Sequence, residues 1–318
     1  IFLEANLSKC NLNEADLSNA DFSKANLNQS SIVESNLTRA RFNGANMESA
    51  DFTDSRLNMS VFFEANFKNA NMNRTLVKGA KLAGGIFENT SMPRADITGA
   101  DLTDAKFLKS NLSRAKLNGA ILRRTDLKGS DLSEADLSIA DLTGASLTEV
   151  KLIGANMERI KLNQAKISEA KLCGAKMKKG KLFQVDLTKA DLSGANMMGV
   201  DLTESNLEGS DLSRANLTEA VLQKANLKAS FLIGANLQKA DLEEANLENA
   251  KIAGTTMRNA NCCKANMKNV DLQRSDLEHT NFTQADLRGS NLTGSKLGEA
   301  RFQDANLTDA DLSLADTT

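Results

Sequence analysis

Residues 15–29 read ADLSN ADFSK ANLNQ, which is one five-residue pattern repeated three times. Each copy has a small residue, then Asp or Asn, then a large apolar residue and two polar residues. The large apolar residue recurs at every fifth position from Phe2 to Leu312, at 63 positions without a break. Most of these residues are Leu, Phe, Met or Ile, and the exceptions are Val77 and Cys262. Such a period has to be interpreted before any helix or strand is assigned, because it determines the architecture.

A period of five residues suits neither common secondary structure. On an α-helix, five residues advance by about 500°, so successive large residues form no stripe. On a straight strand, an odd period places successive large residues on opposite faces of the sheet. A chain that keeps all of them on one side must turn a corner once per repeat. The sequence therefore predicts a solenoid with the large residues pointing inward.

The spacing of the inward Phe residues predicts how many repeats make one coil. Six pairs of them are twenty residues apart, and Met72 and Met92 repeat this lag. The pairs are formed by Phe2, Phe22, Phe42 and Phe62, by Phe67, Phe87 and Phe107, and by Phe282 and Phe302. Like side chains stack on like when strands are in register. Four repeats per coil give a square cross-section and, for 318 residues, about 16 coils.

The other positions of the repeat fit this geometry. The small residue is expected near a corner on the inside, where a second large side chain would not fit. Asp or Asn is expected at the turn, because its side chain can accept hydrogen bonds from backbone groups one or two residues on. Each coil bonds to its neighbours, so the ends are open edges. Residues 83–94, which include Gly84, Gly85 and Pro93, are the least regular, and we expect a bulge or widened turn there.

The repeat resembles the pentapeptide-repeat family over essentially the whole chain. The resemblance is carried by motifs such as Ala15-Asp16-Leu17-Ser18, Ala95-Asp96-Ile97-Thr98 and Ala215-Asn216-Leu217-Thr218. It implies an all-β fold, the right-handed quadrilateral β-helix. In the quinolone-resistance members of that family, an acidic dimeric rod resembles B-DNA and binds DNA gyrase.

The composition bounds the organisation of the chain. A solenoid core grows in one dimension, so we expect residues 1–318 to form a single domain. The chain starts within a repeat at Ile1, and a fragment of a longer protein is left open. The formal net charge is −2, and no apolar run is long enough for a signal peptide or a membrane span. We expect a bacterial, cytoplasmic protein, with a secreted effector as the alternative.

Residues that could carry chemistry are few. Cys10 and Cys262 occupy inward positions and Cys173 and Cys263 outward ones, so we expect four free thiols and no metal site. His279 is the single His, at a water-facing position, and a triad would need a nucleophile aligned on it. A convex solenoid offers no cleft to shift a pKa. We predict no catalytic, cofactor-binding or metal-binding residues.

Basic residues are concentrated in one segment. Residues 151–190 carry ten basic and three acidic residues, and six Lys there replace the usual Asp or Asn. These six and two further Lys form what we call the lysine collar: Lys151, Lys161, Lys166, Lys171, Lys176, Lys178, Lys179 and Lys181. The functional hypothesis is a site for an anionic partner. The alternative is a solvated face that the adjacent acidic segments neutralise.

Outward apolar residues are a second candidate binding feature. Val61 and Phe63 are one pair, Phe231 and Ile233 are another, and Phe183 is next to the collar. Single exposed apolar residues are normal in soluble proteins. Pairs of them indicate docking points for a cap, a partner chain or a second copy.

Three functions follow as hypotheses. The first is a non-enzymatic, rigid scaffold for protein–protein interaction, since solenoids commonly serve as extended binding surfaces. The second is a DNA-mimicking inhibitor or protector of a type II topoisomerase, although mimicry needs about one negative charge per 1.7 Å and basic residues here nearly match acidic ones. The third is the repeat arm of a larger bacterial effector. We expect a protein partner or self-association through the open ends, and neither direct nucleic-acid binding nor a membrane.

Overall fold

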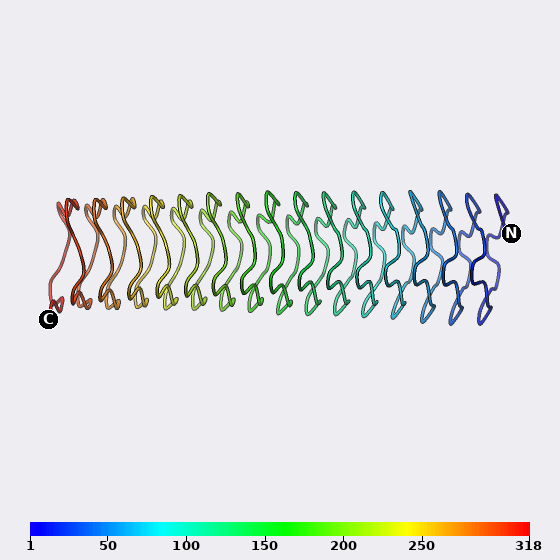
Figure 1. Ribbon diagram of the computed structural model, residues 1–318, viewed down its shortest axis with the longest axis horizontal. Coiled ribbons are helices and arrows are strands. Elements are labelled where there is room, and N and C mark those ends of the chain that lie inside the picture. The colour runs from blue at the N-terminus through cyan, green and yellow to red at the C-terminus, as the bar shows by residue number, and fades with distance from the viewer. The chain divides into compact units, whose positions relative to one another are not determined.

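A computed structural model describes residues 1–318, which divide into two compact units, Ile1–Lys161 and Leu162–Thr318. Each unit is a β-helix solenoid that contains no α-helix. Figure 1 shows the successive coils, coloured blue to green in the first unit and green to red in the second. That residues 1–318 form one domain stays a prediction.

The strand elements of both units are isolated one-residue parallel bridges. In the first unit they begin with Asn6 paired to Asn26 and end with Asp141 paired to Lys161. In the second they run from Lys166 paired to Asp186 to Lys296 paired to Asp316. Bridge partners are twenty residues apart in every case, which is the lag that the Phe and Met positions predict. Four bridge residues and four turns therefore make up each twenty-residue coil.

The repeat at residues 66–70 shows how every backbone N–H finds an acceptor. Asn66 N–H donates to Ala45 O in the coil before, at 3.0 Å, while Phe67 and Asn69 N–H donate to carbonyls of the coil after, at 2.7 and 2.9 Å. Lys68 N–H donates to the side-chain oxygen Oδ1 of Asn66, at 3.0 Å. Ala70 N–H closes the turn on Phe67 O, at 2.9 Å. The Asp or Asn thus bonds backbone two residues on, as its residue type predicts.

Each turn places one residue in the left-handed backbone region. In the repeat at 66–70 this residue is Asn69, with φ of 57°, and the same position has positive φ throughout both units. A four-residue turn with positive φ at its third residue is a type II turn, which favours Gly there. Most of these positions nevertheless hold other residues, which cost stability at each corner.

The bulge or widened turn expected within residues 83–94 is not present, so that prediction was wrong. Gly84 takes the positive-φ position and Gly85 the small position of an ordinary repeat. Pro93 takes the second residue of its turn, which Pro favours in type II turns. The N–H of that position bonds only a preceding Asp or Asn side chain, never the ladder, so Pro fits without breaking the coil.

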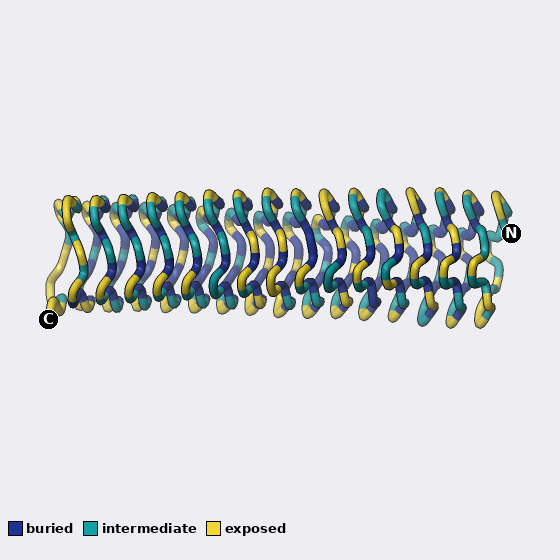
Figure 2. Tube along the Cα trace, viewed as in Figure 1, coloured by how far each residue is buried: buried dark blue, intermediate teal, exposed yellow.

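The core is a set of side-chain columns along the axis of each unit. Figure 2 shows buried residues, in dark blue, alternating with exposed residues along the coils. All six predicted Phe pairs are stacked, with ring centroids 4.5 to 5.1 Å apart. The small positions are mostly Ala, Ser or Thr, and the buried hydroxyls donate to backbone carbonyls. One example is Thr90 Oγ1, which donates to Phe67 O at 2.8 Å. Larger residues also occur at the small positions, such as the fully buried Val150 and Ile160, so a larger side chain is not excluded from every corner.

The corner conformation yields a stability prediction at Ile139. This β-branched residue has φ of 54° and is 54% exposed, so it gains little burial for a strained backbone. We expect Ile139→Asn to stabilise the first unit by about 1 kcal/mol, since Asn tolerates the left-handed region. Urea titration followed by circular dichroism measures the change.

The control for Ile139→Asn is Gly99→Ala, which we expect to change stability in the opposite direction. Gly99 has φ of 64°, and a Cβ atom added there would meet no atom within 4 Å. Any loss in Gly99→Ala therefore comes from the backbone, and we expect about 1 kcal/mol of destabilisation. A stable Gly99→Ala variant would show that the corners carry no such strain.

Candidate functional site

The first unit contains two residues of the lysine collar. Lys151 pairs with Asp131 in the ladder, and its Nζ lies 3.9 Å from the Asp131 carboxylate. Lys161 pairs in the ladder with Asp141, a largely buried carboxylate that also accepts a bond from Arg123 at 2.8 Å. Both lysines are exposed, and both lie next to an acidic residue one coil away.

The second unit contains the other six. The ladder partners of Lys166, Lys171 and Lys181 are Asp186, Asp191 and Asp201. Lys176 pairs with Asn196, while Lys178 and Lys179 lie on the adjacent turn, where Lys179 has φ of 55°. The ladder partners of the collar lysines are therefore mostly Asp residues, and Lys151 forms an ion pair with its partner. This arrangement favours the solvated, neutralised alternative, and the collar as a binding site stays a prediction.

The outward apolar residues differ in exposure. Phe63 is 43% exposed, Phe231 37% and Ile233 47%, whereas Val61 and Phe183 are half-buried. The Lys251 ammonium lies 5.4 Å from the Phe231 ring centroid, a cation–π contact that partly covers that ring. Ile233 also borders a shallow hollow of about 420 Å³, whose remaining lining is Cys173, Ser193, Gly194, Ser213 and Arg214.

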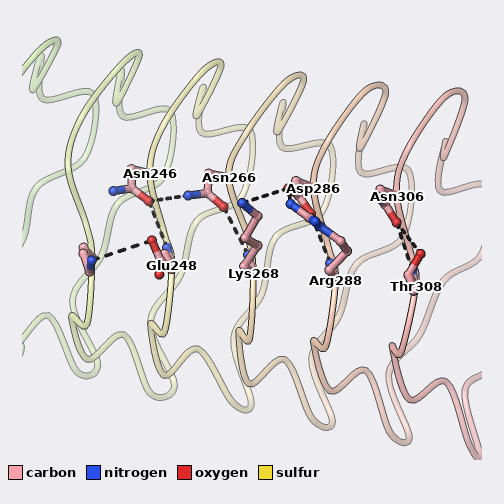
Figure 3. A network of polar contacts seen from close by, with 9 residues as sticks. Asn246, Glu248, Asn266, Lys268, Asp286, Arg288, Asn306 and Thr308 are labelled. Atoms are coloured by element: carbon pink, nitrogen blue, oxygen red, sulfur yellow. Dashed lines mark hydrogen bonds and ion pairs between the residues drawn. The ribbon is translucent and has the colours of Figure 1, made fainter.

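A polar network follows one side of the second unit (Figure 3). The Asn266 amide donates to Asn246 Oδ1 at 3.0 Å. One coil after Asn266, the Asp286 carboxylate contacts the side chains of Lys268 and Arg288. Arg288 bonds Asp286 at 2.7 and 2.8 Å, and Lys268 Nζ lies 3.3 Å away. The hydrogen bonds from Arg288, with smaller help from Lys268, lower the pKa of Asp286 to about 2.

This pKa shift makes the network pH-sensitive. Because the pKa of Asp286 is lower in the folded state than in the unfolded state, where it is near 4, ionised Asp286 stabilises the fold at pH values above 4. This stabilisation is lost as the pH falls towards 2. Since the side chain is 27% exposed, we expect Asp286→Asn to cost about 1 kcal/mol at pH 7 and almost nothing near pH 2. Urea titrations of both proteins across this pH range measure the difference.

Asp126→Asn is the matched control for this change. Asp126 also accepts a backbone bond two residues on, from Lys128 N–H at 3.0 Å, but it has no ion pair. Asn keeps that acceptor, so we expect Asp126→Asn to be neutral at every pH. An equal cost for both substitutions would contradict the role of the Arg288 and Lys268 contacts.

The residues that could carry chemistry lie apart. His279 is exposed, with Nδ1 3.2 Å from a Glu299 carboxylate oxygen. The four cysteines are unpaired, and burial raises the pKa of the Cys262 thiol. Neither unit contains a group of three or more His, Cys, Asp or Glu arranged to hold a metal ion. No helix of a length and hydropathy that would cross a membrane is present.

The structure also reveals a basic pocket in the first unit that the sequence analysis missed. Arg74, Arg94 and Arg114 occupy the positive-φ position of three successive coils and line a hollow of about 290 Å³. The signal was present in the sequence, since these residues are twenty apart. We call this site the arginine pocket.

Comparison with known proteins places the chain in a family. A model described as "Pentapeptide repeats (8 copies)" matches residues 70–107, 110–148, 140–178, 181–218 and 285–316. A second, "Pentapeptide repeat region", matches residues 5–82 and 210–282. The chain therefore belongs to the pentapeptide-repeat family, as its motifs predict. No protein of curated function matches it significantly.

Several solved structures are similar. HetL, a pentapeptide repeat protein involved in heterocyst differentiation regulation from the cyanobacterium Nostoc sp. strain PCC 7120, is 28% identical, with 77% of this chain and 88% of that one covered and a TM-score of 0.33. A trypsin-treated form of QnrB1, a plasmid-mediated fluoroquinolone resistance protein, is 20% identical. The match covers 51% of this chain and 92% of QnrB1, with a TM-score of 0.40. A pentapeptide repeat protein of the Arabidopsis thaliana thylakoid lumen is 30% identical. The match covers 34% of this chain and 72% of that protein, with a TM-score of 0.20.

Proposed function

We propose that this chain is a non-enzymatic scaffold for protein–protein interaction. One observation carries the proposal: residues twenty apart form columns, so each side of a unit presents an ordered, closely spaced array of side chains. Asn206, Asn226, Asn246 and Asn266 form one such column, joined by side-chain hydrogen bonds of 3.0 to 3.2 Å. Fixed arrays of this kind suit recognition of an extended partner surface.

We extend the proposal to the cross-section and handedness of the β-helix and to the cellular location of the protein. Four bridges and four turns in each twenty-residue coil support a quadrilateral cross-section, with about 16 coils in 318 residues. We take the helix to be right-handed, as in the family. We place the protein in the bacterial cytoplasm, with a secreted effector as the alternative.

The partner surface is proposed to lie in the second unit, at the collar lysines on the turn and ladder of residues 171–181 and at the exposed pair Phe231 and Ile233. Support comes from the four collar residues of this unit that replace Asp or Asn in the ladder, which are Lys166, Lys171, Lys176 and Lys181. Charge compensation by Asp186, Asp191 and Asp201 is the competing explanation. An experiment that changes charge at the collar and, separately, elsewhere on this unit distinguishes the two.

Charge reversal tests the surface. The variant Lys171→Glu, Lys176→Glu, Lys178→Glu is compared with Lys239→Glu, Lys264→Glu, Lys296→Glu, which changes the net charge equally. Proteins retained from a bacterial lysate are identified, and each interaction is then measured with the purified partner. We expect the collar variant to lose a partner that the control retains. Equal retention by both variants would remove the collar from the proposal.

A supercoiling assay separates the scaffold from the DNA-mimic alternative. Lys and Arg number 39 against 41 Asp and Glu, so the chain lacks the charge density of a DNA duplex. We expect no inhibition of DNA gyrase by the protein at micromolar concentration and no protection from a quinolone. Inhibition would replace the scaffold proposal with the mimic.

A further inference from the structure

The arginine pocket lies on a column in which a block of basic residues is flanked by acidic residues. In coil order, the corner positions hold Glu34, Asp54, Arg74, Arg94, Arg114 and Glu134. Three arginines thus follow one another in neighbouring coils, with Glu34 and Asp54 on one side of them and Glu134 on the other. Like charges at about 4.8 Å strand spacing repel each other unless something compensates them.

Carboxylates compensate the two outer arginines. Arg74 bonds Asp54 in the coil before, with Nε–Oδ1 at 2.7 Å and Nη2–Oδ2 at 2.5 Å. Arg114 bonds Glu134 in the coil after, at 2.9 and 3.0 Å. Both pairs are bidentate, and they hold these side chains in opposite directions along the column. The middle residue, Arg94, has no acid partner, although its backbone N–H bonds Ser113 O at 3.0 Å.

Further donors without partners line the same hollow as Arg94. The hollow of about 290 Å³ is lined by Asn73, Arg74, Pro93, Arg94, Ser113 and Arg114. The Asn73 amide and the Ser113 hydroxyl make no side-chain hydrogen bond within the protein, while their backbone N–H groups bond Asn71 and Asn111. Pro93, which has no N–H donor, lies between them in the same column. Arg94, Asn73 and Ser113 therefore offer free N–H and O–H groups to one space.

We propose that the arginine pocket binds a phosphate group, either free phosphate or the terminal group of a small phosphomonoester. The planar guanidinium of Arg94 can bond two oxygens at once, and Asn73 and Ser113 supply donors for a third. A carboxylate has only two oxygens and would leave some of these donors unused. A water molecule occupies about 30 Å³ of liquid volume, so the hollow has room for a tetrahedral oxyanion and part of its carrier. This site is independent of the proposed scaffold function.

The test is a titration of the purified chain at constant ionic strength. Inorganic phosphate and O-phosphoserine are the two phosphate probes, acetate is the carboxylate probe, and ³¹P line broadening or calorimetry measures binding. We expect saturable phosphate binding that Arg94→Gln weakens at least about tenfold, since a charge-assisted bidentate contact is removed. Tighter binding of phosphoserine would assign the site to an ester, and equal binding would assign it to the phosphate group alone.

Arg39→Gln is the matched control. Arg39 also occupies an exposed corner, with φ of 62°, and lacks an ion pair, but the residues one coil away are Asn19 and Met59, not arginines. We expect phosphate binding by Arg39→Gln to equal that of the unchanged protein, with circular dichroism verifying both folds. Three results would overturn the proposal: phosphate binding that does not saturate, phosphate binding by Arg94→Gln as tight as that of the unchanged protein, or acetate binding as tight as phosphate binding. None of these outcomes bears on the lysate experiment.

Discussion

Replacing Phe87 by Ala is expected to destabilise the first unit by about 3–5 kcal/mol. Phe87 is fully buried and stacked between Phe67 and Phe107, with ring centroids 4.9 and 4.5 Å away. Its removal leaves a cavity between two rings that the backbone ladder holds in place, so the coils cannot close around the gap. The loss therefore includes both the transfer of the ring out of water and the unfilled volume.

The damage should be local, because each coil of a solenoid contacts only its neighbours. We expect amide hydrogen exchange to accelerate most in the coils that contain Phe67, Phe87 and Phe107. Phe63→Ala is the control: that ring is 43% exposed, and its loss should cost within about 0.5 kcal/mol. Similar costs for the two substitutions would show that the stacked column does not stabilise the unit.

The stacking of Phe87 was predictable because the fold converts sequence distance directly into spatial contact. Once the lag of twenty is recognised, the neighbours of any residue can be read from the sequence, and the six Phe pairs follow. Local turn chemistry was harder to predict. Gly84, Gly85 and Pro93 suggested an irregularity, yet each is a residue type that a type II turn or a small position accepts. Composition alone did not show which turn position each one takes.

The candidate sites were less predictable, because the sequence gives the neighbours of a surface side chain but not its chosen partner. Arg74 and Arg114 hold equivalent positions, yet one bonds the coil before and the other the coil after. The isolation of Arg94 has a simpler cause, because the corner residues one coil away on either side of it are Arg74 and Arg114. For the lysine collar, the lag of twenty already places Lys171 next to Asp191, and the structure confirms this ladder pairing. Whether the collar binds a partner depends on chemistry outside the chain.

The second large effect is expected at the small position of the repeat. Ala115 is fully buried at a corner, and the residues one coil away on either side are Ala95 and Ala135, also fully buried. A Leu side chain there has no space without moving the turn, whose N–H to Leu112 O bond is 3.0 Å long. We expect Ala115→Leu to cost about 2–3 kcal/mol through overpacking, measured by urea titration and by faster exchange in adjoining coils.

Ala115→Ser separates overpacking from a general intolerance of change. Elsewhere in this unit a buried Ser takes the same position: Ser60 Oγ donates to Leu37 O at 2.7 Å, and Ser30 Oγ donates to Leu27 O at the same distance. The corresponding carbonyls near residue 115 belong to Met92 and Leu112, so a hydroxyl there would find an acceptor and should be close to neutral. If Ala115→Ser costs as much stability as Ala115→Leu, the loss arises from the polarity of the side chain and not from its volume. The buried Ser and Thr residues of the other coils would then need a different explanation.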